Sequence, residues 1–236
     1  MTGMPFTVTP SSNHASPTGS LPFLLPPTSS PLLPAARLPI AQERILNHAS
    51  KQGHVLCALP VGKLVASTTR IDAYLIMIDV SIRPAWLHSL YLSPRNRHIV
   101  ERLYLKPTSS SWAVQKSLEH TLQTAVQEQL ILATPRSRID VDDIYARARQ
   151  SLESFALVLE DEEKEVGEGN AWVLGGDGKG RPTLIDAALF AYTHLLLDES
   201  MGWKDKRLVV SVHRWPVLMR HRDKILKEFY GDVMER

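Results

Sequence analysis

Apolar residues recur at alternating intervals of three and four in the stretch from residue 141 to 159. They are Val141, Ile144, Ala148, Leu152, Phe155 and Leu159. In an α-helix this spacing places all of them on one face. Because such a face must be buried against other elements, the stretch predicts a long helix that packs on a common core.

Helical patterns occupy most of the chain after residue 39. They are expected at 40–49, 71–92, 96–105, after the serines at 109–111, after residue 183 and from 216 to about 230. Pro84 should kink or restart the second helix and Pro107 should end the third, because proline cannot donate to the helical ladder. Almost no strand pattern follows residue 40, so the sequence predicts an all-α domain over residues 40–236.

Residues 1–39 differ sharply from the rest, since they contain nine of the sixteen prolines. A segment of this composition buries too little apolar surface to offset its loss of conformational entropy. We therefore expect a largely disordered Pro/Ser-rich arm over residues 1–39. Within it, the stretch from Ser16 to Leu25 is typical of a turn followed by a short apolar strand.

The charge pattern and the cysteine count exclude several classes of protein. The net charge of +2 does not favour a polyanionic partner, and the single Cys57 suits a reducing compartment. No Lys or Arg precedes Arg37, so neither a secretory signal nor a matrix-targeting presequence is expected. The longest apolar run in a helical pattern, Ala73–Ile78, is too short to cross a bilayer.

A Thr-x-x-Asp sequence precedes the apolar helical pattern that follows residue 183. Thr183 and Asp186 can form an N-capping box, in which each side chain bonds the backbone of the other. The residues behind the box are apolar on almost every side, which predicts a central, buried helix. The box is expected to be structural, not catalytic.

Three features that could suggest chemistry are better explained by structure. The glycines at 175–180 lack the spacing of a phosphate-binding loop and the Ser or Thr that follows its lysine. The nine histidines show no metal-ligand spacing, and Cys57 has no recognisable partner base. We therefore expect no catalytic residue, no cofactor and no metal.

Basic residues gather near the C-terminus, and acidic ones at 160–168. A candidate partner-binding or membrane-facing surface consists of Arg214, Arg220, Arg222, Lys224 and Lys227. A solvated helix face explains these charges about as well, and too few aromatic residues interleave with them to favour nucleic acid. The acidic residues are expected in a solvated linker or at a helix end.

The Thr-x-x-Asp box late in an all-α domain resembles the C-terminal domain of glutathione transferases, and finer matches resemble the metaxin branch of that superfamily. These matches are Lys51-Gln-Gly-His-Val-Leu56, Ala85-Trp-Leu-His-Ser-Leu-Tyr-Leu92, Trp172-Val-Leu-Gly175 before the box, and Arg214-Trp-Pro-Val-Leu218. The stretch from Ser16 to Leu24 is also similar to metaxin sequence. The resemblance implies that Pro22 is the cis-proline of a partial thioredoxin-like domain, and it covers roughly residues 13–230.

The form of these motifs is most similar to the fungal metaxin-2-like subunit of the mitochondrial sorting and assembly machinery. The resemblance implies a non-enzymatic subunit, peripheral on the cytosolic face of the outer membrane, that helps receive and insert β-barrel precursors. Its implied partners are the barrel subunit of the machinery, a second metaxin-like subunit and the signal strand of the precursor.

Two other functions remain open from the sequence. A glutathione transferase relative is one, although Leu25-Pro-Pro-Thr-Ser29 stands where the enzymes hold the Glu-Ser pair that binds glutathione. A transferase-like docking domain of a translation-factor or synthetase complex is the other.

Overall fold

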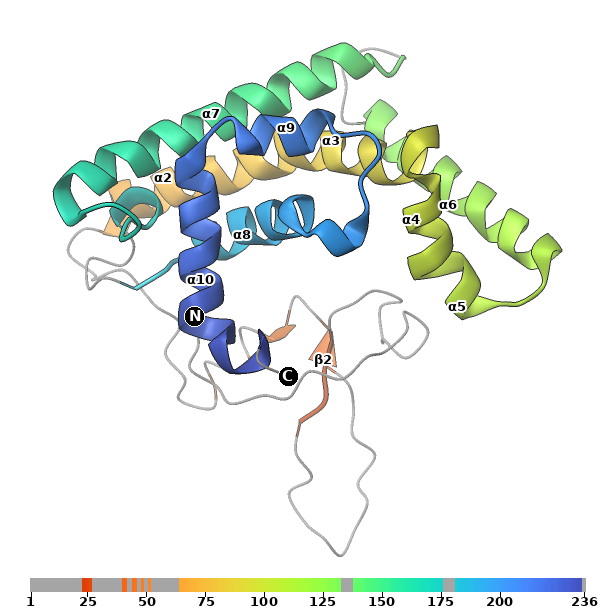
Figure 1. Ribbon diagram of the computed structural model, residues 1–236, viewed down its shortest axis with the longest axis horizontal. Helices are drawn as coiled ribbons and strands as arrows, with labels where there is room; N and C mark the ends of the chain where they lie inside the picture. The colour runs from red at the N-terminus through yellow and green to blue at the C-terminus, as the bar shows by residue number, and fades with distance from the viewer. Residues whose placement is uncertain are drawn as a thin grey trace, which may run out of the picture. The chain divides into compact units, whose positions relative to one another are not determined.

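The computed structural model describes residues 23–26, 40–41, 44–45, 48, 51, 64–132, 138–175 and 181–234. The chain divides into two units, Met1–Val61 and Gly62–Arg236. The division between residues 1–39 and 40–236 stays a prediction. In the second unit, nearly all of the described chain is helical (Figure 1).

Within the first unit, two short strands form an antiparallel pair. Strand β1 (Phe23–Leu24) pairs with β2 (Ile40–Ala41), with Phe23 opposite Ala41 and Leu24 opposite Ile40. The apolar strand expected before Leu25 is thus present. Ile40–Ala41 was expected to open a helix, but these residues pair with a strand that lies far away in the sequence. Pro22 and the rest of the arm expected to be disordered, apart from residues 23–26, lie outside the described residues.

The second unit begins with one long helical segment that runs through Pro84. It comprises α2 (Leu64–Met77), a π-helical turn η3 (Ile78–Ile82), α3 (Arg83–Leu87) and a second π-helical turn η4 (His88–Leu92). The amide of Arg83 donates to the carbonyl of Ile78, five residues back. A regular turn would press the proline ring against the carbonyl four residues back, so the wider turn lets the helix continue where a kink was expected.

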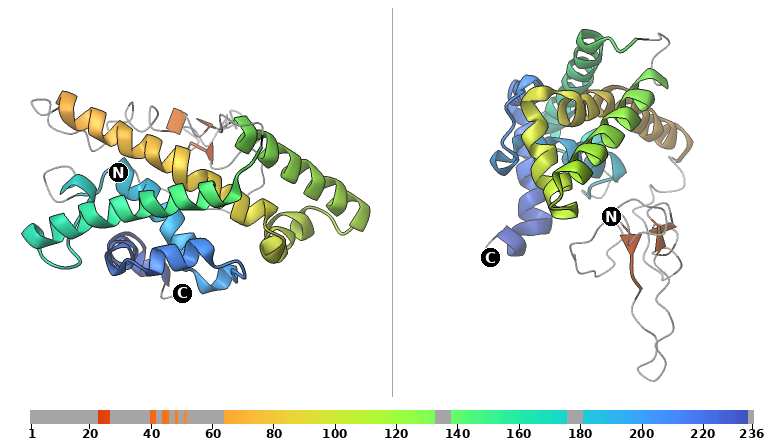
Figure 2. Two further views of the ribbon diagram at one scale, coloured as in Figure 1. Left: turned by 90° about the horizontal axis from the view of Figure 1, so that it is seen from above. Right: turned by 90° about the vertical axis from the view of Figure 1, so that its right-hand side faces the viewer.

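The same solution recurs at Pro107. A 3₁₀ turn η5 (Pro94–Asn96) leads into α4 (Arg97–Val100), the π-helical turn η6 (Glu101–Leu105) and α5 (Lys106–Thr108). The amide of Lys106 donates to the carbonyl of Glu101, so the helix extends to Thr108 and does not end before the proline. Helix α6 (Trp112–Leu132) follows. Figures 1 and 2 show α4, α5 and α6 at one end of this unit.

Helix α7 (Val141–Val166) is the central helix of the unit. It packs against η3, α3, α9 and α10, and Asp140 caps it by accepting from the amide of Asp143. Five residues of its predicted apolar stripe are buried, namely Ile144, Ala148, Leu152, Phe155 and Leu159, and the sixth, Val141, is half-buried. The acidic residues from 160 onward form its last turns, one of the two alternatives that the sequence left open.

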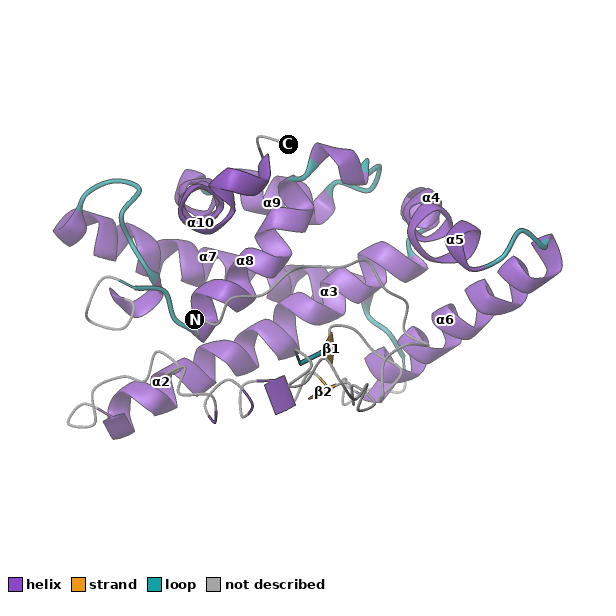
Figure 3. Ribbon diagram, turned by 90° about the horizontal axis from the view of Figure 1, so that it is seen from below, coloured by secondary structure: helices purple, strands orange, loops and turns teal. Residues whose placement is uncertain are grey.

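The remaining elements complete the bundle around α7. They are η7 (Val173–Gly175), α8 (Leu184–Leu197), η8 (Glu199–Met201), α9 (Arg207–His213) and α10 (Pro216–Met234) (Figure 3). Helix α8 packs on α2, α9 and α10. Its side chains Ile185 and Leu189 are buried, but Leu184 is 54% exposed. The sequence predicted a helix buried on almost every side, but α8 is buried on one side only. Its described neighbours cover the face with Ile185 and Leu189 and leave Leu184 exposed.

No helix in the described part of the chain is both long enough and apolar enough to cross a membrane.

Candidate functional site

The N-terminus of α8 contains the capping box that the sequence predicted. Thr183 is the residue before the helix, and Asp186 is the third residue within it. The Asp186 Oδ2 atom accepts from the amide of Thr183 at 2.7 Å and from its hydroxyl at 3.0 Å. Both residues are buried. Water cannot reach this helix end, so side chains satisfy its backbone groups instead.

The Asp186 carboxylate also joins two segments that the box motif does not include. Its Oδ1 atom accepts from the amide of Val173 at 2.8 Å and lies 3.0 Å from His221 Nε2. One buried carboxylate thus links η7, α8 and α10, and a carboxylate is the side chain with enough acceptor positions for this. Sequence reasoning missed Val173 and His221, since they lie 13 and 35 residues from Asp186 and share no periodicity with it.

His221 is the one group in this cluster with an unused polar atom. Its side chain is 1% exposed, and its Nδ1 atom has no hydrogen-bond partner among the described residues. The ring packs edge-on against Trp172, with 6.0 Å between centroids. With one nitrogen facing Asp186 and the ring enclosed by packing, His221 serves to attach α10 to the start of α8.

Most of the basic residues predicted as a surface instead contact their own unit. Arg220 binds Glu163 near the end of α7 through two hydrogen bonds, and its third nitrogen lies 3.1 Å from Glu168. The hydrogen bond from Arg220 lowers the pKa of Glu163. Lys224 donates to the carbonyl of Asn170 at 2.7 Å.

Lys224 and Arg222 also have internal partners. The Lys224 ammonium lies 3.5 Å from the centroid of the Trp172 ring, a cation–π contact, and burial lowers the pKa of this lysine. Arg222 pairs with Asp223 at 2.9 Å, and its side chain is 20% exposed. Of the five predicted residues, Arg214 and Lys227 are exposed. Arg220, Lys224 and Lys227 are spaced to share one face of α10, but the first two contact Glu163 and Asn170, so this face is not a free basic surface.

A second polar cluster joins the end of η4 to the loop before α9. The side chain of Asn96 is buried and accepts from the amides of Lys204 and Asp205 at 3.0 and 2.8 Å. Asp205 accepts from the Ser93 hydroxyl at 2.9 Å and from Arg207 Nη2 at 2.7 Å. The Arg207 hydrogen bonds lower the pKa of Asp205 to about 2.

An open depression of about 470 Å³ lies over this second cluster. Its lining residues are Ser93, Pro94, Arg95, Asp205 and Arg207. The guanidinium of Arg207 lies 3.9 Å from the centroid of the Tyr145 ring and is paired with Asp205. Because Arg207 and Asp205 are paired with each other, Arg95 is the one charge among the described lining residues that remains to bind a charged ligand in this depression. Its residues are better suited to fixing two loops than to catalysis.

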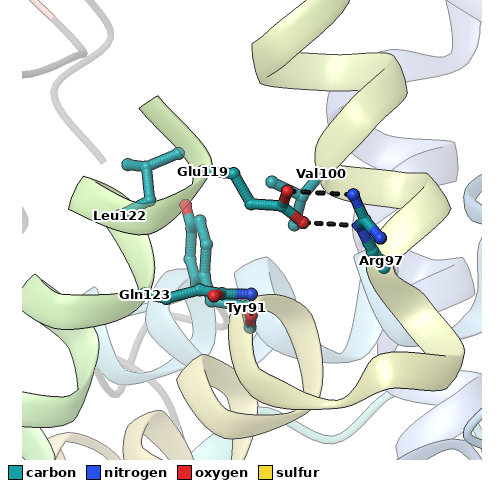
Figure 4. A pocket seen from close by; sticks show the side chains of 6 residues that line it. All are labelled: Tyr91, Arg97, Val100, Glu119, Leu122 and Gln123. Atoms are coloured by element: carbon teal, nitrogen blue, oxygen red, sulfur yellow. Dashed lines mark hydrogen bonds and ion pairs between the residues drawn. The ribbon is translucent and has the colours of Figure 1, made fainter. Parts of the chain in front are cut away.

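A smaller pocket, of about 10 Å³, lies between α4 and α6 (Figure 4). Its volume is sufficient for about one water molecule. Glu119 of α6 points toward Arg97 of α4, and Lys116 lies 3.0 Å from the same carboxylate. Burial raises the pKa of Glu119, but the hydrogen bonds from Lys116 and Arg97 outweigh it and the pKa is lowered. The sequence did not single out this glutamate, which anchors α6 to α4.

The other residues considered from the sequence are partly outside the described chain. Cys57 and residues 176–180 of the glycine-rich loop are among those left undescribed. In the described part, no group of three or more His, Cys, Asp or Glu side chains could hold a metal ion.

Comparison with known proteins places the chain near one superfamily. Residues 1–96 match the family model described as the glutathione S-transferase N-terminal domain. A comparison with curated proteins gives no match. The first 96 residues are therefore similar to a glutathione-transferase N-terminal domain, and the mainly helical second unit fits a C-terminal bundle of that type, which confirms the predicted fold class.

Proposed function

We propose that this chain is a non-enzymatic, peripheral subunit of the mitochondrial outer-membrane sorting and assembly machinery. In this role it helps to receive and insert β-barrel precursors. Its partners are the barrel subunit, a second metaxin-like subunit and the precursor signal strand, and its site is the cytosolic face of the membrane.

One observation carries the proposal. The transferase-type N-terminal match covers the stretch where the enzymes bind glutathione, yet β1 ends at Leu24 and is followed by Leu25-Pro-Pro-Thr-Ser29. That stretch lacks the Glu-Ser pair of the enzymes. The metaxin-like motifs then recur in order along the same chain, up to the start of α10.

The described helical unit supports the same interpretation. Asp186 and Asp205, its two buried aspartates, are fully engaged with backbone amides, hydroxyls, Arg207 and His221. Carboxylates used in this way stabilise the arrangement of helices. A rigid helical unit of this kind suits a subunit that acts by contact with other proteins.

The test is affinity purification of the tagged chain from detergent-solubilised mitochondria. Recovery of the barrel subunit together with a second metaxin-like protein is expected, and failure to recover the barrel subunit would refute the proposal. Carbonate extraction combined with protease treatment of intact mitochondria should release the chain and show that it is accessible from the cytosolic side.

The same family match keeps an enzyme as the second candidate, since residues 1–96 match a transferase domain. Retention on immobilised glutathione, together with conjugation of glutathione to an electrophilic substrate, would favour that alternative. Because residues 25–29 lack the Glu-Ser pair, we expect neither retention on immobilised glutathione nor conjugation.

A further inference from the structure

The junction between α5 and α6 lies at an end of the helical unit (Figures 1 and 2), and large apolar side chains are exposed there. Trp112 is 72% exposed, Val114 48%, Leu103 43% and Tyr104 38%. The other four tryptophans of the chain, at 86, 172, 203 and 215, are buried or half-buried. A single exposed apolar side chain is ordinary, but an exposed tryptophan accompanied by three further exposed apolar side chains favours an external contact.

The charges around these four side chains have one sign. Arg102, Lys106 and Lys116 are the charged residues between positions 102 and 118, and no Asp or Glu occurs there. The nearest acids on either side are occupied: Glu101 pairs with Arg97 at 3.2 Å, and Glu119 is held by Arg97 and Lys116. Because Lys116 is itself paired with Glu119, the exposed Arg102 and Lys106 give the junction its positive charge.

The backbone of the junction is held by its own contacts. The Thr108 hydroxyl donates to the carbonyl of Tyr104 at 2.6 Å, and the side-chain amide of Gln115 donates to the carbonyl of Ser109 at 2.7 Å. Tyr104 also packs against Tyr91, with 5.9 Å between ring centroids. The exposed side chains thus extend from a fixed turn.

We infer that the α5–α6 junction, defined by Leu103, Tyr104, Lys106, Trp112 and Val114, binds the surface of a membrane that contains anionic lipids. Trp and Tyr favour the interface between headgroups and acyl chains, where an aromatic ring is buried while its polar atom remains hydrated. Lysine and arginine next to them are attracted by anionic headgroups. A set of aromatic, aliphatic and basic side chains without any acid matches this surface in both respects.

This inference adds a direct lipid contact to the proposed function, and either can fail alone. Vesicles contain no protein, so vesicle binding does not depend on the barrel subunit. Recovery of the barrel subunit in detergent, in turn, does not depend on a lipid surface.

The test uses the purified full-length chain and flotation with phosphatidylcholine vesicles, with or without phosphatidylglycerol. Binding is expected to the mixed vesicles and to weaken as salt is added. Trp112→Ser should reduce the affinity about tenfold, because it removes the largest inserted side chain. Lys106→Gln should reduce it about fivefold, as expected for one lysine near an anionic surface.

A matched control and a second readout make the result specific. Val210 on α9 is 61% exposed, so Val210→Ser removes an exposed apolar side chain elsewhere and should leave binding unchanged. Lipids brominated on their acyl chains should quench Trp112 fluorescence in the wild type, and this quenching should be absent in Trp112→Ser. Circular dichroism and the melting temperature should be the same in all variants, since the substituted side chains are exposed.

The inference is wrong if the wild type does not float with anionic vesicles, or if Trp112→Ser and Lys106→Gln float as well as the wild type. If these two variants keep lipid binding but lose co-purification of the barrel subunit, the junction is a protein-docking surface instead.

Discussion

Asp186 shows how much of a buried polar cluster can be predicted at the scale of single residues. Its contact with Thr183 follows from a spacing of three in the sequence, and the structure contains it. Its contacts with Val173 and His221 depend on how η7 and α10 fold back onto α8. Local spacing predicts the first kind of contact because the helix alone fixes the geometry. The second kind depends on the tertiary fold, and no local pattern indicates it.

Thr183→Ala should lower the free energy of unfolding by about 1 kcal/mol, measured by urea denaturation followed by circular dichroism. The variant loses the hydroxyl that bonds Asp186 but keeps the amide that the same carboxylate accepts. Thr121→Ala is the control, because the exposed hydroxyl of Thr121 bonds only within α6. Equal melting temperatures for Thr183→Ala and the wild type would contradict a stabilising box.

Asp205 should make the stability of the unit depend on pH in the acid range. The pKa of its carboxyl is lowered from 3.8 to about 2, mainly by Arg207, so the folded state favours the ionised form. This contribution is complete above pH 3.8 and is lost as the pH falls toward 2. The stability difference between the wild type and Asp205→Asn should therefore shrink over that interval. A difference that stays constant from pH 5 to pH 2 would be the contrary result.

At the scale of elements, prediction succeeded where one helix face decides the outcome. The stripe on α7 could be predicted because its apolar residues recur with the helical period. Five of these residues are buried in the structure. Pro84 and Pro107 were predicted to interrupt their helices, and here the sequence misled. A helix can also accommodate proline by widening the turn before it, as η3 and η6 do. Whether a proline interrupts its helix or is accommodated depends on the elements that pack against the turn before it. At Pro84 that turn is η3, which packs against α7.

Arg220 and Lys227 test whether the charges of α10 act inside the unit or outside it. Arg220→Ala should cost about 1 kcal/mol in the free energy of unfolding, since it removes two charge-assisted hydrogen bonds to Glu163 at a partly exposed position. Lys227→Ala should change that free energy by less than about 0.5 kcal/mol, because Lys227 is exposed. Equal effects of the two substitutions in denaturant titrations would show that the α7–α10 contact adds no stability.

For the whole molecule, the sequence predicted a mainly helical unit next to a different N-terminal part. It predicted a helix from Ile40, but Ile40–Ala41 pair as a strand, whereas residues 44, 45, 48 and 51 are helical. The clusters around Asp186 and Asp205 were the part least accessible to sequence, because they join residues as much as 35 and 112 positions apart. The α5–α6 junction was also missed, because exposure is a property of the folded unit.

If the chain acts by docking, stability and assembly should be coupled. Thr183→Ala and Asp186→Asn should both reduce recovery of the barrel subunit from mitochondria grown at elevated temperature, with Asp186→Asn having the larger effect. Its amide cannot accept from all the donors that now face the carboxylate, which we expect to cost about 3 kcal/mol. Growth at a lower temperature should restore recovery, because these substitutions act through folding. A loss that persists at every temperature would instead place these buried residues in the interface.

The widened turn before Pro84 has a consequence for how this chain could change in length. A π-helical turn has one more residue than the regular turn it replaces, so it behaves like a single-residue insertion accommodated within a helix. Val80 lies in this turn and is 49% exposed. Deleting Val80 together with Pro84→Ala, which removes the ring that needs the wider turn, should therefore convert η3 to a regular turn and leave α3 facing the core. Deleting one residue from the middle of α7 would instead rotate half of its buried stripe toward solvent.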